Sequence, residues 1–157
     1  MEASDFDEIE FFAAIARAGV RALLIGRRAL VLLGLPVLTA DYDFWIDLDD
    51  IGRFNAAAEP FGLHPSRPPD EALRVGRYVL ENDEHVDVLV ARSVQTVDGA
   101  VVEFEALWTR RRSLSLTGHV SIAIPDIAGL ILTKRIAARP KDLEDIRLLD
   151  TLRTEEA

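Results

Sequence analysis

The chain has 157 residues, of which 49% are hydrophobic and 29% charged, a size and composition that suit one globular domain with a single core. The absence of cysteine excludes disulfides and thiolate metal sites, and it is compatible with a reducing cytoplasm. A net charge of -9 counts against broad nucleic-acid binding, residues 1–10 lack the basic start of a signal peptide, and no uncharged apolar run is long enough to cross a membrane.

The N-terminal part of the sequence alternates between helical and extended patterns. Asp5 or Asp7 could cap the first helix, because a short acidic side chain accepts hydrogen bonds from free backbone N–H groups. Gly26, Gly34 and Gly62 fall at the ends of predicted elements. These elements are a helix over 6–18, a strand over 21–25, a helix over 27–33, a strand over 39–47 and a helix over 51–60.

The C-terminal part begins with a turn-rich loop over 65–70 that holds three prolines. The elements predicted after it are a hairpin over 76–81 and 85–91, a segment over 101–108 that suits either a strand or a short helix, a strand over 120–124, a helix from 125 to about 138, a helix over 141–152 and a frayed tail over 153–157. The order predicts one α+β domain over 1–157, with its core at about 21–150, a small mixed sheet flanked by helices and a helical C-terminal third.

The predicted strand over 39–47 has one acidic and one apolar face. Two carboxylates one strand repeat apart repel each other, and a hard divalent cation such as Mg²⁺ relieves the repulsion. The strand therefore predicts either a metal site or an exposed acidic strand end, and its Trp45 could stack on a base or pack at the sheet edge. The acidic face consists of Asp41, Asp43, Trp45 and Asp47, and the apolar face of Tyr42, Phe44, Ile46 and Leu48.

A third carboxylate lies in the second strand of the predicted hairpin. Val86, Val88 and Val90 share one face of this strand, which leaves Asp87 on the other face with His85. An aspartate in so apolar a strand requires either a metal ion or an ion-pair partner such as a nearby arginine. The neighbours of His85 are polar, which favours a surface histidine over a ligand.

Two further features could bind phosphate. Gly26 lies between a strand and a helix N-terminus, where backbone amides favour an anion, although many such turns need a glycine for conformational reasons alone. Lys134 lies on the apolar stripe of its helix, four residues after Leu130, so it either snorkels to water or reaches a fixed anion. The basic residues at 110–112 and 134–141 could grip an RNA end, or they are solvated faces.

Taken together, these motifs resemble the nucleotidyltransferase superfamily that includes DNA polymerase β, and most of all its small bacterial members of the abortive-infection and toxin–antitoxin type. The resemblance rests on the glycine turn at Gly26, on Asp41-Tyr42-Asp43, on Asp87, and on the lysine helix at Lys134 followed by 139–146. It spans residues 23–149 and implies the nucleotidyltransferase fold. One departure is Arg27, where the family has a second small residue; it could block the triphosphate or donate to it.

The resemblance implies a role for each candidate residue. Asp41 and Asp43 would hold two Mg²⁺ or Mn²⁺ ions, Asp87 would complete one metal site and could act as the base, and all three would be catalytic. Gly26, Arg27 and Lys134 would bind the phosphates of a nucleoside triphosphate (NTP), the substrate. Asp142 would orient Lys134 or a nearby arginine.

The implied reaction is transfer of a nucleoside monophosphate from an NTP to an acceptor hydroxyl. The acceptor could be an RNA 3′ end, a small molecule such as an aminoglycoside, which suits an acidic surface, or a protein. The alternatives are a non-catalytic binding module, such as one partner of a toxin–antitoxin pair with a protein antitoxin, and an acidic domain of unrelated fold. The last alternative predicts that Asp41, Asp43 and Asp87 lie far apart.

Overall fold

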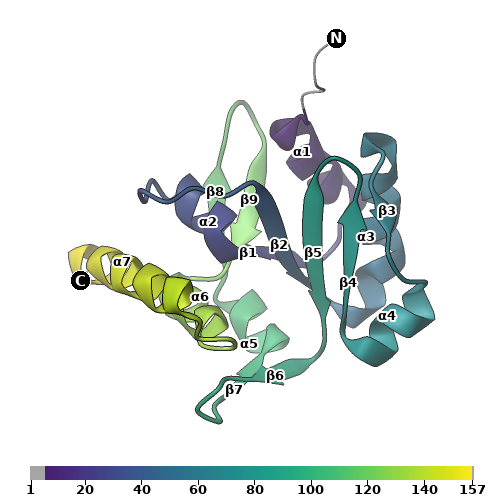
Figure 1. The fold of residues 1–157 in the computed structure, drawn as a ribbon. Coiled ribbons are helices and arrows are strands. Elements are labelled where there is room, and N and C mark those ends of the chain that lie inside the picture. Colours follow the sequence, from purple (N-terminus) through teal and green to yellow (C-terminus); the bar gives the residue numbers. More distant parts are fainter. Residues whose placement is uncertain (1–5, 157) are drawn as a thin grey trace.

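A five-stranded mixed sheet forms the centre of the protein, whose structure is a computed structural model that describes residues 6–156 (Figure 1). Strands β2 and β5 run parallel, whereas every other neighbouring pair in this sheet is antiparallel. In spatial order the strands are β1 (Ala22–Ile25), β2 (Asp41–Ile46), β5 (His85–Val90), β4 (Arg77–Glu81) and β3 (His64–Pro65). The small mixed sheet predicted from the sequence is confirmed.

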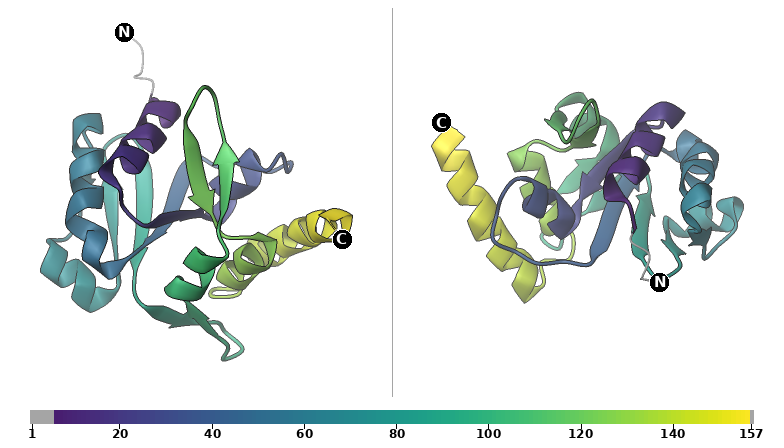
Figure 2. Two further views of the ribbon diagram at one scale, coloured as in Figure 1. Left: turned by 180° about the vertical axis from the view of Figure 1, so that it is seen from behind. Right: turned by 90° about the horizontal axis from the view of Figure 1, so that it is seen from above.

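Helices surround the sheet, and two short antiparallel ribbons extend from it (Figure 2). The helices are α1 (Glu8–Ala18), α2 (Gly26–Leu32), α3 (Ile51–Ala58), α4 (Pro69–Val75), α5 (Phe104–Thr109), α6 (Ile127–Lys134) and α7 (Pro140–Glu156), with short 3-10 turns at Leu48–Asp50 and Glu59–Phe61. The ribbons pair β6 (Ser93–Gln95) with β7 (Val101–Glu103) and β8 (Arg112–Ser115) with β9 (Ser121–Ile124).

The main core lies between one face of the sheet and helices α1 and α3. Phe44 is fully buried there and meets Phe11 of α1 and Phe54 of α3, with ring centroids 6.1 Å and 5.3 Å away. The three valines of β5 point to the same side and are buried, as the alternation predicts. The opposite face of the sheet is therefore free to present Asp43 and Asp87.

Trp45 closes one end of that opposite face. It is fully buried in a second apolar cluster with Leu23, Phe104 and Leu107, and its indole N–H donates to the Ala91 carbonyl at 2.8 Å. Because no part of its ring is exposed, Trp45 packs within the protein and cannot stack on a nucleotide base.

Several element boundaries differ from the prediction. Helix α4 replaces part of the predicted loop, because Pro69 suits the first helical turn and Gly76 ends the helix with a left-handed φ of 94°. The segment 101–108 is both a strand and a helix. Helix α6 ends at Lys134, before the predicted end, while α7 continues through the predicted tail to Glu156. No helix within residues 6–156 combines the length and apolar content needed to cross a membrane.

Candidate active site

The pairing of β2 with β5 brings the predicted carboxylates together. In the parallel register Asp43 lies directly opposite Asp87, and Asp41 lies opposite His85. Residues that face each other across paired strands project from the same side of the sheet, so the three acids share the face that α1 and α3 leave open. The hypothesis of an acidic domain with distant carboxylates is therefore wrong.

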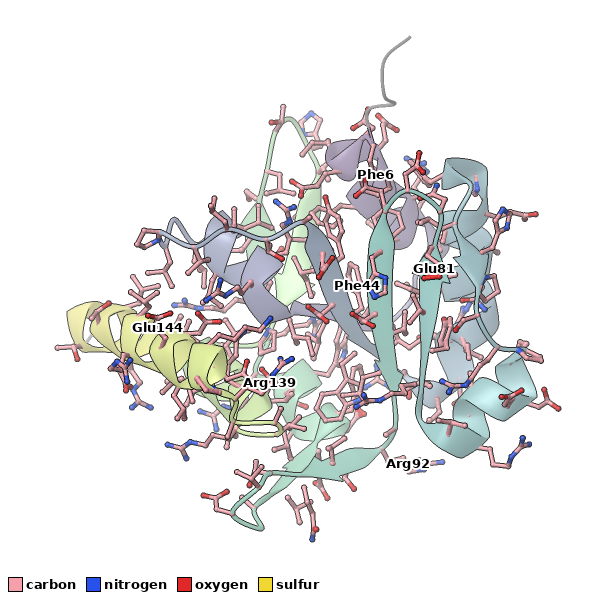
Figure 3. The ribbon with its side chains drawn as sticks, viewed as in Figure 1. Phe6, Phe44, Glu81, Arg92, Arg139 and Glu144 are labelled. Atoms are coloured by element: carbon pink, nitrogen blue, oxygen red, sulfur yellow. The ribbon has the colours of Figure 1, made fainter. Side chains whose placement is uncertain are left out.

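A cavity of about 440 Å³ opens above these acids. Its walls include all seven residues predicted from the sequence, namely Gly26, Arg27, Asp41, Asp43, Asp87, Lys134 and Asp142. Figure 3 shows Arg139 on the side of the α6–α7 connection and Glu81 on β4, on the other side of the acidic strands. The basic residues 110–112 are not among the lining residues: Arg110 pairs with Asp126 at 3.3 Å, and Arg111 stacks on Trp108.

The surroundings of Asp43 disfavour ionisation of its carboxyl group. Burial raises its pKa, and the neighbouring charge of Asp87 raises it further, whereas Lys134 acts in the opposite direction; the result is a pKa of about 6. Burial and repulsion disfavour the ionised form of this carboxyl group, and a cation that binds beside it stabilises that form. The ionisation of Asp43 therefore depends on what occupies the cavity.

The donor set fits a hard divalent cation, although the side chains are not yet gathered around one position. Asp43 and Asp87 offer oxygen ligands from adjacent strands, and Asp41 offers a third at the exposed strand start. Asp87 Oδ2, however, lies 3.2 Å from His85 Nε2, and across residues 6–156 no three acidic or histidine side chains converge as a ready metal site. Because a carboxylate has two oxygens, Asp87 can keep this contact through Oδ2 and offer Oδ1 to a cation.

The turn between β1 and α2 brings backbone against Asp43. Gly26 has a φ of 73°, in the left-handed region that favours glycine, and a Cβ atom on it would lie 2.3 Å from Asp43 Oδ2. Only glycine therefore allows the first amides of α2 to approach the carboxylate side of the cavity. The predicted phosphate turn lies immediately beside the predicted metal ligand.

Replacing Gly26 with alanine tests this close approach. The variant should lose about 2–4 kcal/mol of unfolding free energy, since left-handed strain and overlap with Asp43 add together. Gly34→Ala is the matched control, because Gly34 has a φ of 88° with nothing within 4 Å, and it should cost only about 1 kcal/mol. Urea unfolding measures the free energy of unfolding of both variants. Equal losses would show that the Asp43 side chain moves away from the new methyl group without an energetic penalty.

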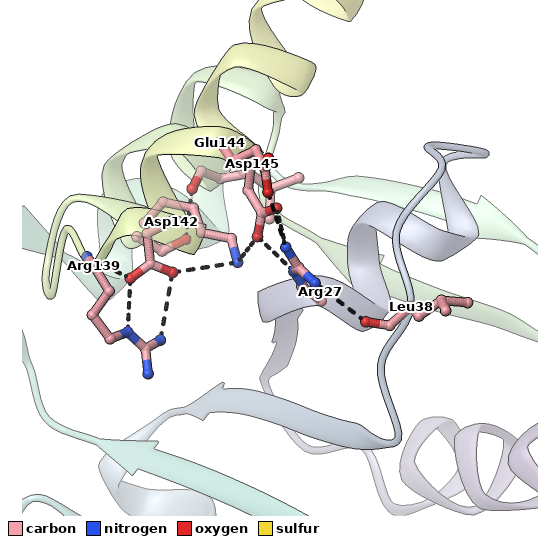
Figure 4. A network of polar contacts seen from close by, with 9 residues as sticks. Arg27, Leu38, Arg139, Asp142, Glu144 and Asp145 are labelled. Carbon is pink, nitrogen blue, oxygen red and sulfur yellow. Dashed lines mark hydrogen bonds and ion pairs between the residues drawn. The ribbon is translucent and has the colours of Figure 1, made fainter.

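Lys134 is held by an aspartate that the sequence reasoning missed. Its side chain is only 7% exposed, and its Nζ lies 2.8 Å from Asp145 Oδ2; Asp145 is fully buried (Figure 4). Burial opposes ionisation of Asp145, but hydrogen bonds from Arg27 and Lys134 outweigh it and lower its pKa. The available signal was the spacing of Asp145 along α7, three residues after Asp142 on a helix whose buried side also holds Leu149.

Arg27 points toward α7. Its Nε and Nη2 donate to the two oxygens of Asp145 at 3.1 Å each, and its Nη1 donates to the Leu38 carbonyl at 3.4 Å. The guanidinium therefore forms the fork geometry expected of arginine, but with a carboxylate of the protein. Phosphate binding by Arg27 stays a prediction, and it would require the side chain to exchange this partner.

Asp142 contacts both partners predicted for it. Its Oδ2 accepts from Arg139 Nε at 2.9 Å and from the Arg139 backbone N–H at 3.0 Å, and its Oδ1 lies 3.8 Å from Lys134 Nζ. Burial opposes ionisation of Asp142, but Arg139 and Lys134 together lower its pKa. A continuous chain of ion pairs thus runs from Arg27 through Asp145, Lys134 and Asp142 to Arg139 (Figure 4).

Comparison with known proteins places the fold. No protein-family model and no curated protein matches the sequence. Among solved structures, the solution structure of the antibiotic-resistance factor ANT(2″)-Ia is similar to this chain with a TM-score of 0.62 and 17% sequence identity. The alignment covers 90% of this chain and 80% of that one. Its crystal structure in complex with adenylyl-2″-tobramycin also has a TM-score of 0.62, with 19% identity over 90% and 84%. A candidate nucleotidyltransferase from Thermotoga maritima has a TM-score of 0.57, with 16% identity over 92% and 87%.

The chain therefore has the nucleotidyltransferase fold. The resemblance inferred from the sequence is confirmed at this level, and the α+β class is confirmed with it. At identities of 16–19% the likeness concerns the fold, so the activity is argued separately from the residues of the cavity.

Proposed function

We propose that the protein is a nucleotidyltransferase that moves a nucleoside monophosphate from an NTP to an acceptor hydroxyl. The observation that carries the proposal is the juxtaposition, in one cavity, of the paired acids Asp43 and Asp87 with the Gly26 turn. Neighbouring carboxylates attract divalent cations, and a helix N-terminus behind a glycine attracts phosphate. An NTP with its cation presents both partners at once.

In this proposal Asp41, Asp43 and Asp87 hold Mg²⁺ or Mn²⁺. When bound, the cation supplies charge neutralisation for the phosphates and lowers the pKa of a coordinated hydroxyl. The expectation depends on the residues present: all three donors are hard oxygens on one face of the sheet, and burial together with repulsion by Asp87 raises the pKa of Asp43, effects that a bound cation would offset.

The residues of the chain would position the reaction. The acceptor oxygen forms a bond to the α-phosphorus, the bond from that phosphorus to the bridging oxygen breaks, and pyrophosphate leaves. The hydroxyl proton would pass to Asp87 or to water. The Gly26 turn and Lys134 would bind the phosphates, with Arg27 beside them, and Asp145 and Asp142 would hold Lys134 in place.

A thermal-shift screen of the four NTPs, each with and without Mg²⁺, tests the proposal. At a ligand concentration about 100-fold above the dissociation constant, binding to the native state should raise the midpoint by about 5–10 °C. The rise should require Mg²⁺ and should be lost in Asp41→Ala and Asp43→Ala. Asp83→Ala, in the exposed turn of the hairpin, is the control and should keep it. No rise with any NTP would contradict the proposal.

The proposals for the acceptor and for the biological role rest on other observations than the cavity. ANT(2″)-Ia, one of the structural neighbours, forms a complex with adenylyl-2″-tobramycin, which favours a small-molecule acceptor by analogy of fold. The toxin role and a protein antitoxin rest on the sequence resemblance alone. A toxin should arrest growth of its host when expressed, and Asp43→Asn should relieve the arrest.

The non-catalytic alternative was motivated by Arg27, which could obstruct the triphosphate. The guanidinium of Arg27 is paired with Asp145 and Leu38 on the side of α7. The pairing of Arg27 with Asp145 supports the catalytic proposal over a turn blocked by arginine, and the thermal-shift screen decides between the two.

A further inference from the structure

We propose that the acceptor carries a negative charge beside its reactive hydroxyl, and that Arg77 and Arg67 form the wall that binds it. This inference rests on the proposed function and specifies its substrate class. It concerns the part of the cavity that the triphosphate site does not use. The chemistry expected there is that of a phosphate group, from either a nucleic-acid end or a small phosphorylated molecule.

The register of the sheet places Arg77 beside the acids. Val79 of β4 lies opposite Asp87, and Arg77 lies opposite Leu89, so Arg77 projects from the same face as Asp87 and one strand repeat away. Diagonal neighbours on adjacent strands are separated by about 7–8 Å, a distance that an arginine side chain can span. Arg77 therefore reaches the space next to Asp87 from the side away from Gly26.

Arg67 joins the same wall through a backbone contact. Its Nη1 donates to the Arg77 carbonyl at 2.7 Å, which ties the loop before α4 to the start of β4, and its Nε lies 3.5 Å from Glu71. Both arginines line the cavity. Arg77 has an exposed side chain, and within residues 6–156 it forms no ion pair with a carboxylate, so its charge is available to a ligand.

The charges of the cavity differ from those of the whole protein. Six basic and four acidic side chains line it, although the net charge of the chain is -9. Three of the basic groups (Arg27, Lys134 and Arg139) have aspartate partners, among them the lining acid Asp142. The other three lining acids, Asp41, Asp43 and Asp87, are the proposed cation ligands. Salt screens exposed charges beyond about 8 Å at physiological ionic strength. The arginines of the cavity wall therefore influence acceptor binding more than the acidic residues on the distant surface do.

The direction of the reaction assigns this wall to the acceptor. In phosphoryl transfer the attacking oxygen and the leaving oxygen lie roughly in line on opposite sides of the phosphorus. If the leaving pyrophosphate lies against Gly26 and Lys134, the acceptor approaches from the side of β5 and β4. Of the charged side chains on this face of β4, Arg77 lines the cavity, whereas Glu81 pairs with His85 at 3.6 Å and is not among the lining residues. A polycationic acceptor would therefore be repelled by Arg77.

The test measures binding of a fluorescent six-nucleotide RNA with a free 3′-OH, by anisotropy, in the presence of a non-hydrolysable NTP and Mg²⁺. Arg77→Glu should weaken RNA binding by roughly tenfold to a hundredfold, because a charge-assisted hydrogen bond is replaced by repulsion. Arg77→Gln should weaken it less. Arg74→Glu, on exposed helix α4 and outside the cavity, is the matched control and should change it less than twofold.

Competing ligands distinguish the source of the charge. Displacement of the RNA by millimolar AMP would support a small phosphate-bearing acceptor, and retention against AMP would support a nucleic-acid end; either result agrees with the proposal. Unchanged binding in Arg77→Glu, no binding of RNA or AMP, or tighter binding of the polycation neomycin than of either would overturn it. Binding of the NTP is measured separately by thermal shift, so loss of the nucleotide site is distinguished from a wrong acceptor class.

Discussion

Replacing Asp43 with asparagine should abolish nucleotide transfer and, at neutral pH, make the folded protein more stable. The carboxyl group has a pKa of about 6 in the folded protein because it is partly buried and faces Asp87, against 3.8 when unperturbed. An amide of the same shape has no charge to bury and no repulsion with Asp87. The same substitution also removes a predicted cation ligand, so activity and stability should move in opposite directions.

The sign of the pH dependence follows from the raised pKa. Between about pH 4 and pH 6 the folded state binds more protons than the unfolded state, so the wild-type protein loses stability as the pH rises through this range. The loss should reach on the order of 2–3 kcal/mol by pH 7–8, at about 1.36 kcal/mol for each unit of pKa shift. Asp43→Asn lacks this loss.

Urea unfolding of both proteins from pH 4 to pH 8 measures the difference. The curves should meet near pH 4, diverge between pH 4 and pH 6 and stay apart at higher pH, with the variant more stable. Saturating Mg²⁺ and NTP should stabilise the wild type alone and so narrow the gap at pH 8. A variant that is equally stable or less stable at pH 8 would show that Asp43 is not strained by its surroundings.

Replacing Asp145 with alanine should destabilise the protein by about 3–5 kcal/mol, because buried Lys134 loses its carboxylate partner at 2.8 Å and keeps only the longer contact of 3.8 Å with Asp142. Asp145 is fully buried and receives hydrogen bonds from Arg27 and Lys134, so its removal affects two cations at once. Nucleotide binding should weaken with it, since Lys134 would no longer be held beside the cavity. Urea unfolding at pH 7 and the NTP thermal shift measure the two effects.

Two further variants separate the buried charge from the rest of helix α7. Glu144→Ala removes the neighbouring carboxylate, which is 64% exposed and 3.9 Å from Arg27, and should cost less than about 1 kcal/mol. Lys134→Met combined with Asp145→Leu should recover much of the lost stability without restoring nucleotide binding. If Asp145→Ala behaves like Glu144→Ala, the ion-pair chain does not stabilise this junction.

The pH dependence of the Asp145 effect should have the opposite sign to that of Asp43. Because the pKa of Asp145 is lowered in the folded protein, its stabilisation is present above about pH 4 and is lost as the pH falls below that value. The difference between the wild type and Asp145→Ala should therefore shrink in acid. It should stay constant from pH 6 to pH 8.

Local patterns in the sequence were sufficient to identify most of the elements and the candidate residues. Alternation identified β2 and β5 and the faces of Asp43 and Asp87, since side-chain direction in a strand depends only on position along it. Helical spacing placed Lys134 inward, and Gly26 marked the turn into α2. Helix α4 was missed because three nearby prolines suggested a loop, although Pro69 begins the helix.

Tertiary structure decided how these pieces combine. The sequence does not specify which strand pairs with β2 or in which register, and only the parallel pairing with β5 sets Asp43 against Asp87. The burial of Trp45, the turn of Arg27 toward Asp145 and the position of Arg77 next to the acids likewise depend on elements distant in the chain. Periodicity reports the local backbone, whereas strand register and ion-pair partners are set by the packing of whole elements, and the chemistry of this cavity depends on both.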